Sequence, residues 1–275
     1  NKIKTIYSSL AIEGNTLSET QVGDILNGKN VVAPIRELQE VKNAIAVYDN
    51  FASFNPFSLE DLLRAHAQMM PALVETAGQF RRSGVGVFDG DRAVHIAPPF
   101  ERVPELMANL FDWLKNTDDH LLIRSCVFHY EFEFIHPFAD GNGRMGRLWQ
   151  SLILSKLNHV FQYLPVETLV HDNQLKYYEA INASTANNDS GAFIDFMLGE
   201  LLNALKIHQG EPIGRVNGGV SGRVNEVFGY VKAHEGCNAG ELSAALSIPK
   251  RTLARDLKKL ADQVEFRGAP KTGGG

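Results

Sequence analysis

Apolar residues recur at intervals of three and four along most of this chain of 275 residues. Two clear runs consist of Leu59, Leu62, Leu63, His66 and Met70, and of Val103, Leu106, Leu110, Phe111 and Leu114. Because an α-helix turns once in about 3.6 residues, this spacing places largely apolar side chains on one helix face. The pattern predicts a mainly α-helical fold.

Further helices are predicted on the same grounds. Residues 121–135 and 144–157 continue the helical pattern, and helices are also expected over 173–183 and 191–207. Ser58 followed by Asp61 has the spacing of a capping box, with Asp in place of the commoner Glu. We therefore expect a helix to begin directly after Ser58.

Residues 78–99 interrupt the helical pattern. Glycines flank two short β-favouring runs, at 85–88 and 93–96, which are separated by an Asp-Gly-Asp sequence. This arrangement predicts a β-hairpin. Pro98 and Pro99 close it and lead into the next helix.

The C-terminal part differs in composition and in charge. Residues 208–222 are rich in Gly and poor in large apolar residues, which predicts a linker. Residues 223–275 contain three short helical patterns. From residue 221 onward the net charge is +3, whereas residues 1–220 carry −8. We interpret residues 223–275 as a separate small domain.

Composition excludes several classes of protein. The net charge of −5 argues against a chain that coats nucleic acid along its whole length. The two cysteines, Cys126 and Cys237, support neither a disulfide framework nor a cysteine-rich zinc site. No apolar stretch approaches the roughly 20 residues that span a bilayer, and the N-terminal residues lack an export pattern. We therefore expect a cytoplasmic protein that does not act on a membrane.

The segment between the predicted helices 121–135 and 144–157 has the composition of an anion-binding site. It reads His136-Pro-Phe-Ala-Asp-Gly-Asn-Gly-Arg-Met-Gly-Arg147. Gly141-Asn142-Gly143 allows backbone N–H groups to converge, and the following helix adds its N-terminal dipole. Arg144 and Arg147 lie three residues apart and could clamp phosphate oxygens.

Three other residues of this segment have expected roles. Asp140 offers a carboxylate of the kind that binds Mg²⁺ together with phosphates. His136, at the end of the preceding helix, is a candidate general base, and Phe138 is expected to anchor the loop in the core. Taken singly, these residue types also suit a helix cap, a turn or a solvated face. The residue chemistry therefore leaves a phosphate site and an ordinary junction both open.

The whole segment resembles the signature of the Fic family, His-Pro-Phe-x-Asp/Glu-Gly-Asn-Gly/Lys-Arg-x-x-Arg, and fills every specified position. The predicted helices and the hairpin place the resemblance over roughly residues 1–205. Fic enzymes mostly transfer AMP from ATP to a hydroxyl side chain of a target protein. The resemblance thus implies a protein adenylyltransferase with ATP as substrate and Mg²⁺ as cofactor, and with residues 31–207 as its catalytic domain.

The resemblance also implies a role for each matching residue. His136 would deprotonate the target hydroxyl, and Asp140 would hold Mg²⁺ against the α- and β-phosphates. The amides of residues 141 and 143, with the side chain of residue 142, would cradle the α-phosphate. Arg144 would bind the β- and γ-phosphates, and Arg147 the γ-phosphate or a regulatory carboxylate.

The resemblance also implies roles for two further regions. The hairpin at 78–99 would be a flap that holds the target segment by strand addition. Tyr177 and Tyr178 resemble the segment that lines the adenine pocket of the family. Two core aromatic side chains are an equally good interpretation of this pair.

The N-terminal sequence Ser9-Leu-Ala-Ile-Glu13-Gly-Asn15 by itself predicts a short helix stopped by Gly and Asn. Beside the signature it resembles the inhibitory motif of the family, Ser/Thr-x-x-x-Glu-Gly/Asn. The resemblance implies that Glu13 pairs with Arg147 in place of the γ-phosphate, with Ser9 steadying the helix. Residues 1–30 would then be an inhibitory region. Whether Glu13 also supports removal of AMP stays open.

Residues 223–275 resemble a winged helix-turn-helix. The segment 249–260 would be its recognition helix, with Leu253, Leu257 and Leu260 inward and with Lys250, Arg251 and Arg255 outward. Contact with DNA is the functional interpretation. A protein partner and a merely solvated basic face are the alternatives.

The sequence leaves other functions open. A nucleotide-sensing regulator or scaffold is the alternative from another class, although a purely binding site needs no base at His136. A Fic-type enzyme could also transfer phosphate or another phosphate-linked group, whereas Gly143 favours AMP. The target could be the protein itself, and a homodimer is open. His129, Glu131, Glu133 and His136 are rejected as a zinc cluster, because their spacing does not place three ligands on one helix face.

Overall fold

The computed structural model describes residues 2–89, 92–162, 166–208, 230–231 and 239–246, together with Val227, Leu253 and Leu257. The chain divides into two compact units, residues 1–209 and 210–275. Each unit is described by itself. Among the described residues, no helix has both the length and the apolar character needed to cross a bilayer.

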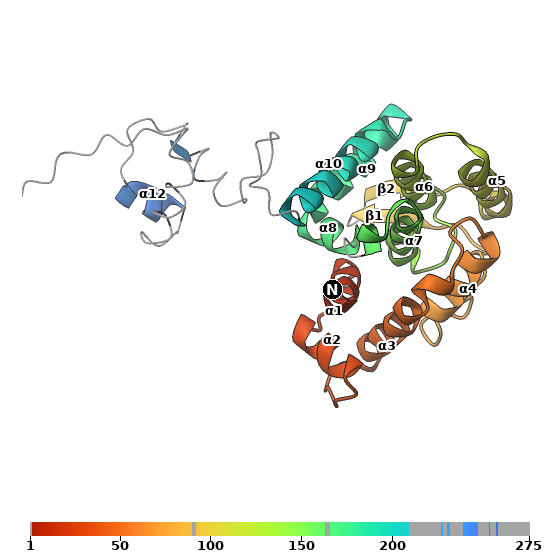
Figure 1. Cartoon of the computed structure of the whole chain (residues 1–275), viewed down its shortest axis with the longest axis horizontal. Coiled ribbons are helices and arrows are strands. Elements are labelled where there is room, and N and C mark those ends of the chain that lie inside the picture. The colour runs from red at the N-terminus through yellow and green to blue at the C-terminus, as the bar shows by residue number, and fades with distance from the viewer. Residues whose placement is uncertain are drawn as a thin grey trace, which may run out of the picture. The chain divides into compact units, whose positions relative to one another are not determined.

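The first unit consists mainly of helices (Figure 1). They are α1 (Lys2–Ile12), α2 (Glu19–Leu26), α3 (Ile35–Asp49), α4 (Leu59–Met69), α5 (Val103–Asn116), α6 (Leu121–Ile135), α7 (Asn142–Leu157), α8 (Val166–Asp172), α9 (Gln174–Asn187) and α10 (Gly191–His208). Short 3₁₀ helices occupy Phe51–Ser53, Phe100–Arg102 and His159–Gln162. The mainly helical fold predicted from the periodicity is confirmed.

Helices α6 and α7 pack against each other, and the loop that joins them carries the signature segment (Figure 1). Helix α6 covers the predicted residues 121–135 and ends because His136 adopts the left-handed conformation, with φ 51°. Helix α7 begins at Asn142, two residues before the predicted start. The difference arises because Gly141, with φ 87°, serves as the N-cap, so that Asn142 and Gly143 already belong to the first turn.

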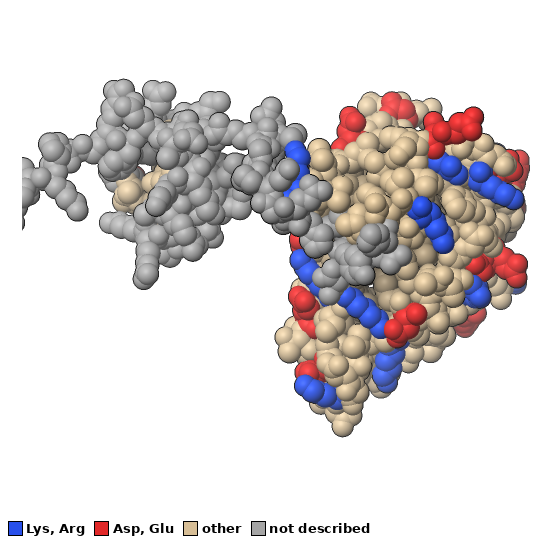
Figure 2. Space-filling model, in the orientation of Figure 1, with Lys and Arg blue, Asp and Glu red and all other residues tan. Residues whose placement is uncertain are grey.

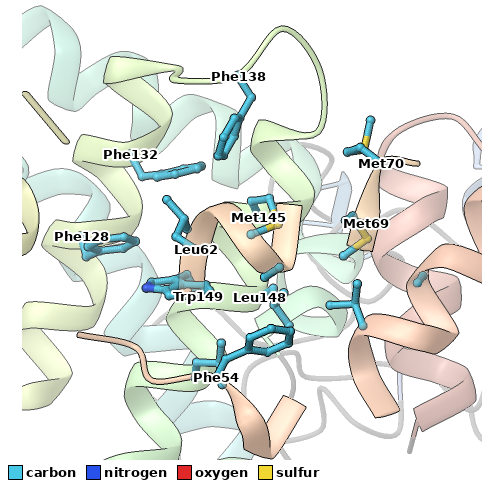
Figure 3. Close-up of a cluster of buried hydrophobic side chains, with 14 of the residues drawn as sticks. Phe54, Leu62, Met69, Met70, Phe128, Phe132, Phe138, Met145, Leu148 and Trp149 are labelled. Atoms are coloured by element: carbon cyan, nitrogen blue, oxygen red, sulfur yellow. The ribbon is translucent and has the colours of Figure 1, made fainter. Parts of the chain in front are cut away.

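The main core lies between α6, α7 and the helices that surround them. Phe128 and Phe132 of α6 and Trp149 of α7 are fully buried, and Phe138 of the loop points toward Phe132 (Figure 3). Ile6 of α1 belongs to the same cluster, so the N-terminal helix packs as part of the body. A second cluster joins α6 to α8, α9 and α10. Burial of such side chains contributes roughly 1.5–3 kcal/mol each.

Two antiparallel strands stand beside the helices, β1 (Gly86–Asp89) and β2 (Arg92–Ile96). Gly86 pairs with Ile96 and Asp89 with Arg92, with a register irregularity between Val87 and Phe88. A further hydrogen bond from Ala97 N to the Val85 carbonyl, at 3.3 Å, extends the pairing toward the base of the hairpin, where the chain enters β1 and leaves β2. This β1–β2 hairpin lies within the segment expected to break the helical pattern.

Several local expectations need correction. The Ser58 hydroxyl accepts a bond from Asp61 N at 3.2 Å, but the Asp61 carboxylate accepts from Asn55 N instead of reaching back to Ser58 N. Only half of the predicted capping box is therefore formed. Helices α2, α3 and α8 were not predicted from the sequence.

The second unit is described at few positions. Helix α12 (Ala239–Ala245) contributes Leu242 to a small apolar cluster with Val227 and Leu253, and Leu257 packs against it. The inward placement of Leu253 and Leu257 is confirmed. The linker was predicted at 208–222, but His208 still belongs to α10. Residues 209–222, Leu260 and the three basic residues of the predicted recognition helix lie outside the described residues.

Charges of both signs are interspersed on the visible face of the helical unit (Figure 2). The exposed apolar side chains of this unit include Val32 and Ile35, which lie just before and at the start of α3. The charged side chains that could bind a ligand or take part in a reaction instead converge at the α6–α7 loop and the end of α1.

Candidate active site

His136 terminates α6 in a strained backbone conformation. Its N–H donates to the Phe132 carbonyl at 2.9 Å, and its Nδ1 lies 3.3 Å from the Glu133 carbonyl oxygen. A positive φ is uncommon for a residue with a side chain, and it turns the chain sharply out of the helix. The half-buried imidazole therefore lies at the entrance of the loop.

The loop is fastened from inside by Asn142 and His66. The Asn142 side chain accepts from Phe138 N and donates to the Phe138 carbonyl, both at 2.9 Å. The Phe138 ring stacks on His66 with ring centres 3.6 Å apart, which confirms it as the apolar anchor. Since this Asn142 side chain already orders the loop, a direct contact from it to phosphate stays a prediction.

His66 is held neutral by its surroundings. Gly78 N donates to its Nδ1 at 2.8 Å, so Nε2 carries the proton and donates to the Asp140 carbonyl at 3.0 Å. Burial lowers the pKa of His66 to about 4. The sequence analysis placed His66 on an apolar helix face and missed this role in supporting the loop.

Small residues line the N-terminus of α7. A Cβ at Gly141 would lie 2.8 Å from Met70 Sδ, and one at Gly143 would lie 2.5 Å from Glu13 Oε1. Glu13 therefore occupies the space directly over the first turn of α7. A carboxylate is favoured there because the free N–H groups and the helix dipole attract negative charge.

Arg147 and Glu13 form the predicted pair. Arg147 Nη2 donates to Glu13 Oε1 at 2.6 Å and to the Ser9 carbonyl at 3.0 Å, and the arginine side chain is 1% exposed. Burial by itself lowers the pKa of Arg147, but Glu13, together with Tyr177 and Glu133, more than offsets it and the net pKa is raised. Ser9 thus contributes through its backbone carbonyl.

A second charge cluster joins the loop to α3. Asp140 accepts from Arg144 Nη2 at 3.0 Å through one carboxylate oxygen and from Arg36 Nη2 at 3.1 Å through the other. Glu40 lies 3.4 Å from Arg36 Nε and 3.9 Å from Arg144 Nη1, and it also accepts from Asn15 Nδ2 at 2.8 Å. Arg36 and Glu40 were not predicted, because their sequence neighbourhoods carry no motif, and Asn15 was predicted only to stop the N-terminal helix.

Two more buried groups on α6 were not predicted to form part of the site. Burial raises the pKa of Glu133 to about 7, and its Oε1 has no hydrogen-bond partner among the described residues. Burial lowers the pKa of His129 to about 3, and the ring contacts Gln150 Oε1 and the Tyr177 hydroxyl. Glu133 Oε1 lies 3.8 Å from His129 Nε2.

Tyr177 and Tyr178 differ in burial. Tyr177 is 2% exposed and lies among His129, Phe193 and Phe196, whereas Tyr178 is 44% exposed. The Tyr177 environment agrees with the core interpretation that the sequence left open. An adenine contact by either ring stays a prediction.

Comparison with solved structures gives the fold its context. A Fic family protein from Desulfovibrio desulfuricans G20 is 43% identical, covers 95% of this chain and 79% of its own, and aligns with a TM-score of 0.73. Fic-1 from Caenorhabditis elegans is 26% identical, with a TM-score of 0.62 over 76% of this chain and 62% of its own. The helical fold and the loop between α6 and α7 together define the class of this protein. It is a helical protein whose candidate active site is the signature segment 136–147.

Sequence comparisons agree with this class. The Fic/DOC family model matches residues 56–154. Protein adenylyltransferase Fic from Culex quinquefasciatus is 31% identical over 207 residues, which are 71% of this chain and 39% of that protein. Protein adenylyltransferase fic-1 from Caenorhabditis elegans is 31% identical over 65% of this chain and 36% of its own length. The chain belongs to the Fic family, and it spans less than half the length of these curated relatives.

Proposed function

We propose that this protein is a protein adenylyltransferase that transfers AMP from ATP to a Ser, Thr or Tyr hydroxyl of a target protein, and that Glu13 inhibits it. One observation carries the proposal. His136, Asp140 and the N-terminus of α7 converge at one loop. The Glu13 carboxylate of the same chain occupies the anion position beside Arg147.

The N-terminus of α7 supplies the features that bind polyphosphate. Backbone N–H groups of its first turn and the helix dipole favour an anion, and Arg144 and Arg147 add two buried guanidinium groups. A γ-phosphate on Arg147 would take the position that Glu13 occupies. ATP bound in this way would place its α-phosphate nearer to the start of the helix, toward His136.

His136 would act as the general base. Nδ1 lies 3.3 Å from the Glu133 carbonyl and would donate its proton to it, which favours the tautomer whose Nε2 lone pair accepts a proton. As the hydroxyl oxygen bonds to the α-phosphorus, its proton passes to Nε2, and the bond from that phosphorus to the pyrophosphate oxygen breaks. The amides of α7 and the two arginines would stabilise the charge that spreads over the phosphate oxygens.

The residues present fit Mg²⁺ through one carboxylate. No group of three or more His, Cys, Asp or Glu side chains gathers around a metal position in the described part of the chain. Asp140 is 36% exposed on its side chain, and its partner Arg36 is 61% exposed and can move away. Mg²⁺ commonly binds through one or two carboxylates plus phosphates and water, where it offsets phosphate charge. Asp140 would hold it in that manner.

The β1–β2 hairpin would hold the target segment. It forms a two-stranded sheet in which each strand pairs only with the other among the described residues. An extended peptide could add to an outer edge through backbone hydrogen bonds, which would orient its hydroxyl toward His136. Target identity would then depend on side chains beside that edge.

The small unit at 223–275 would bind a partner other than the nucleotide. Its basic charge and the apolar cluster around Leu242 and Leu253 support the winged-helix proposal, with DNA as the first candidate partner. A protein partner is the second candidate, and both would be additional to the catalytic unit.

The test follows the two ends of ATP separately. The Glu13→Gly protein is incubated with Mg²⁺ and ATP labelled at the α- or the γ-phosphate, and label on protein is measured in a cell lysate and on the enzyme itself. We expect α-label on protein, and we expect Glu13→Gly/His136→Ala to bind ATP normally but to transfer at least about 10²-fold less.

Each other outcome selects another function. Label from the γ-phosphate alone would mean phosphate transfer, and release of AMP from a pre-labelled protein would mean the reverse reaction. Tight ATP binding with neither label would favour a nucleotide-sensing regulator. Undiminished transfer by the His136→Ala protein would contradict the role of His136 as base.

A further inference from the structure

Arg81 lies between α4 and β1, and its side chain is buried although it carries a charge. The residue is 2% exposed. It matches no part of the signature or of the inhibitory motif. Burying a guanidinium group is costly unless its N–H groups are satisfied, so its hydrogen bonds require an explanation.

One set of bonds reaches the start of the signature loop. Arg81 Nε donates to the His136 carbonyl at 2.8 Å, and Nη2 donates to the Ile135 carbonyl at 3.3 Å. The backbone N–H of Arg81 donates to the Pro137 carbonyl at 2.9 Å. Three successive carbonyl groups are thus fixed by one residue, at the point where His136 takes its left-handed conformation.

A second set of bonds reaches the two ends of the β1–β2 hairpin. Nη1 donates to the Ser83 carbonyl at 2.9 Å, and Nη2 donates to the Pro98 carbonyl at 2.5 Å. Ser83 precedes β1 and Pro98 follows β2. The same guanidinium group therefore joins the base of the hairpin to the backbone of His136.

This arrangement uses the particular geometry of arginine. Four of the five N–H groups of the guanidinium point to four carbonyl oxygens from three separate chain segments. A lysine ammonium carries its donors on a single nitrogen and cannot reach the same four oxygens. Removal of the side chain would leave several buried carbonyl groups without a donor.

We propose that Arg81 is a positioning residue, which holds His136 and the base of the β1–β2 hairpin in one fixed geometry. The inference rests on the proposed function, in which the hairpin presents the target hydroxyl and His136 accepts its proton. A misplacement of about 1 Å between reacting groups can cost roughly 10²-fold in rate. Arg81 would thus affect the rate of transfer without contacting ATP.

The first test measures position without any reaction. Arg81→Gln and Arg81→Lys are compared with Arg82→Gln, whose exposed arginine donates to Gln79 Oε1 at 3.0 Å. The measurements are the imidazole NMR signals of His136, assigned with His136→Ala, and amide hydrogen exchange over residues 84–97. We expect both Arg81 variants to shift the His136 signals and to speed exchange at least tenfold, and Arg82→Gln to do neither. Unchanged signals and exchange in a folded Arg81 variant would overturn the proposal.

The second test measures transfer in the Glu13→Gly background. We expect Arg81→Gln and Arg81→Lys to lower kcat about 10²-fold while the Kd for ATP changes less than about threefold. Arg81→Lys keeps the charge, so it serves if Arg81→Gln does not fold. An undiminished kcat in Arg81→Lys would contradict the need for the arginine geometry. If the Glu13→Gly protein with Arg81 and Arg82 unchanged also fails to transfer AMP, the proposed function fails, and the NMR and exchange results alone decide the role of Arg81.

Discussion

At the scale of single residues, the buried Arg147 guanidinium determines what the site must contain. A cation that is 1% exposed needs an anion beside it, because the penalty for an unpaired buried charge is several kcal/mol. Glu13 is that anion in this structure, and a γ-phosphate would be its natural replacement. In the proposed function, inhibition and ATP binding would therefore use the same contact.

Arg144 is held differently from Arg147. Its counter-charges, Asp140 and Glu40, belong to the loop and to α3 and not to the inhibitory segment. If Glu13 were removed, Arg147 would lose its carboxylate partner at hydrogen-bond distance, whereas Arg144 would keep its own. In the proposed function, Glu13 would therefore act at the position of the γ-phosphate and would leave the contacts of Arg144 unchanged.

Glu133 is a second carboxyl group near this cation, and it gives the site a pH dependence. Its pKa of about 7 arises first from burial, is lowered in part by Arg147 and is raised further by Glu13. Between pH 4.5 and about 7, folded protein therefore holds a proton at Glu133 that unfolded protein has released. Folding stability from this group falls as pH rises through that window.

We accordingly predict that Glu133→Gln stabilises the protein more at pH 8 than at pH 5. The gain relative to wild type should approach the order of 3 kcal/mol above pH 7 and should disappear below about pH 4.5, where both folded and unfolded carboxyls are protonated. Urea unfolding at several pH values measures it. The exposed Glu105→Gln is the control, and a gain from Glu133→Gln that is constant with pH would contradict the assignment.

At the scale of elements, α1 combines a fixed body with an end that can change. Ile6 and Leu10 are buried in the main core, whereas Glu13 follows the last helical residue and Gly14, with φ 87°, ends the helix. Release of Glu13 therefore requires only the end of α1 to move. The buried helix body can stay in place.

The link from α1 to α3 should strengthen the inhibitory contact. Asn15 Nδ2 donates to Glu40 Oε2 at 2.8 Å and to the Glu37 carbonyl at 3.3 Å, which fixes the segment two residues after Glu13. We predict that Asn15→Ala raises AMP transfer by the otherwise unchanged protein about threefold to tenfold, which corresponds to about 0.7–1.4 kcal/mol, the net contribution of roughly one hydrogen bond.

The control for this prediction is an asparagine on α5. Asn116 also donates its side-chain amide to a carboxylate, that of Asp112, at 2.8 Å, but it lies on the exposed surface of that helix. Asn116→Ala should leave the initial rate of transfer unchanged. Equal rates for Asn15→Ala and wild type would show that α3 does not support the inhibitory segment.

Local sequence patterns predicted the helices and the loop that neighbouring residues alone determine. The helices over 121–135 and 191–207 were predicted closely because both segments are rich in apolar residues along their whole length, and the signature segment identified the loop by residue identity. Helix α3 was missed because Ile35 is exposed and its buried face includes Asn43, which weakens the apolar pattern. Arg81 was missed for another reason: its partners are backbone carbonyls, which no sequence motif records.

At the scale of the whole molecule, the two units differ in charge. Residues from 221 onward carry a net charge of +3 against −8 for the preceding residues. This separation suits a chain in which an acidic catalytic unit is joined to a basic unit with a different partner. The winged helix at 223–275 is predicted from the sequence pattern alone, since most of this segment lies outside the described residues.

If the small unit binds DNA, the affinity of the full chain for a duplex should fall steeply with salt. Phosphate contacts release counterions, so log K should decrease linearly with log salt concentration, with a slope of about −0.9 for each contact. The variant with Lys250→Gln, Arg251→Gln and Arg255→Gln should bind more weakly and show a shallower slope. A flat salt response in the unaltered chain would argue against phosphate contacts and for a protein partner.

The central claim is that Glu13 inhibits AMP transfer by occupying Arg147. The most direct measurement is the initial rate of α-phosphate transfer to protein by wild type, Glu13→Gly, Glu13→Gln and the exposed control Glu19→Gln at the same ATP and Mg²⁺ concentrations. We predict that both Glu13 variants exceed wild type by at least about tenfold, a change of about 1.4 kcal/mol, since they free the buried Arg147 cation from its partly exposed carboxylate partner, while Glu19→Gln matches wild type. Equal rates in all four proteins, with transfer detected in each, would contradict the account.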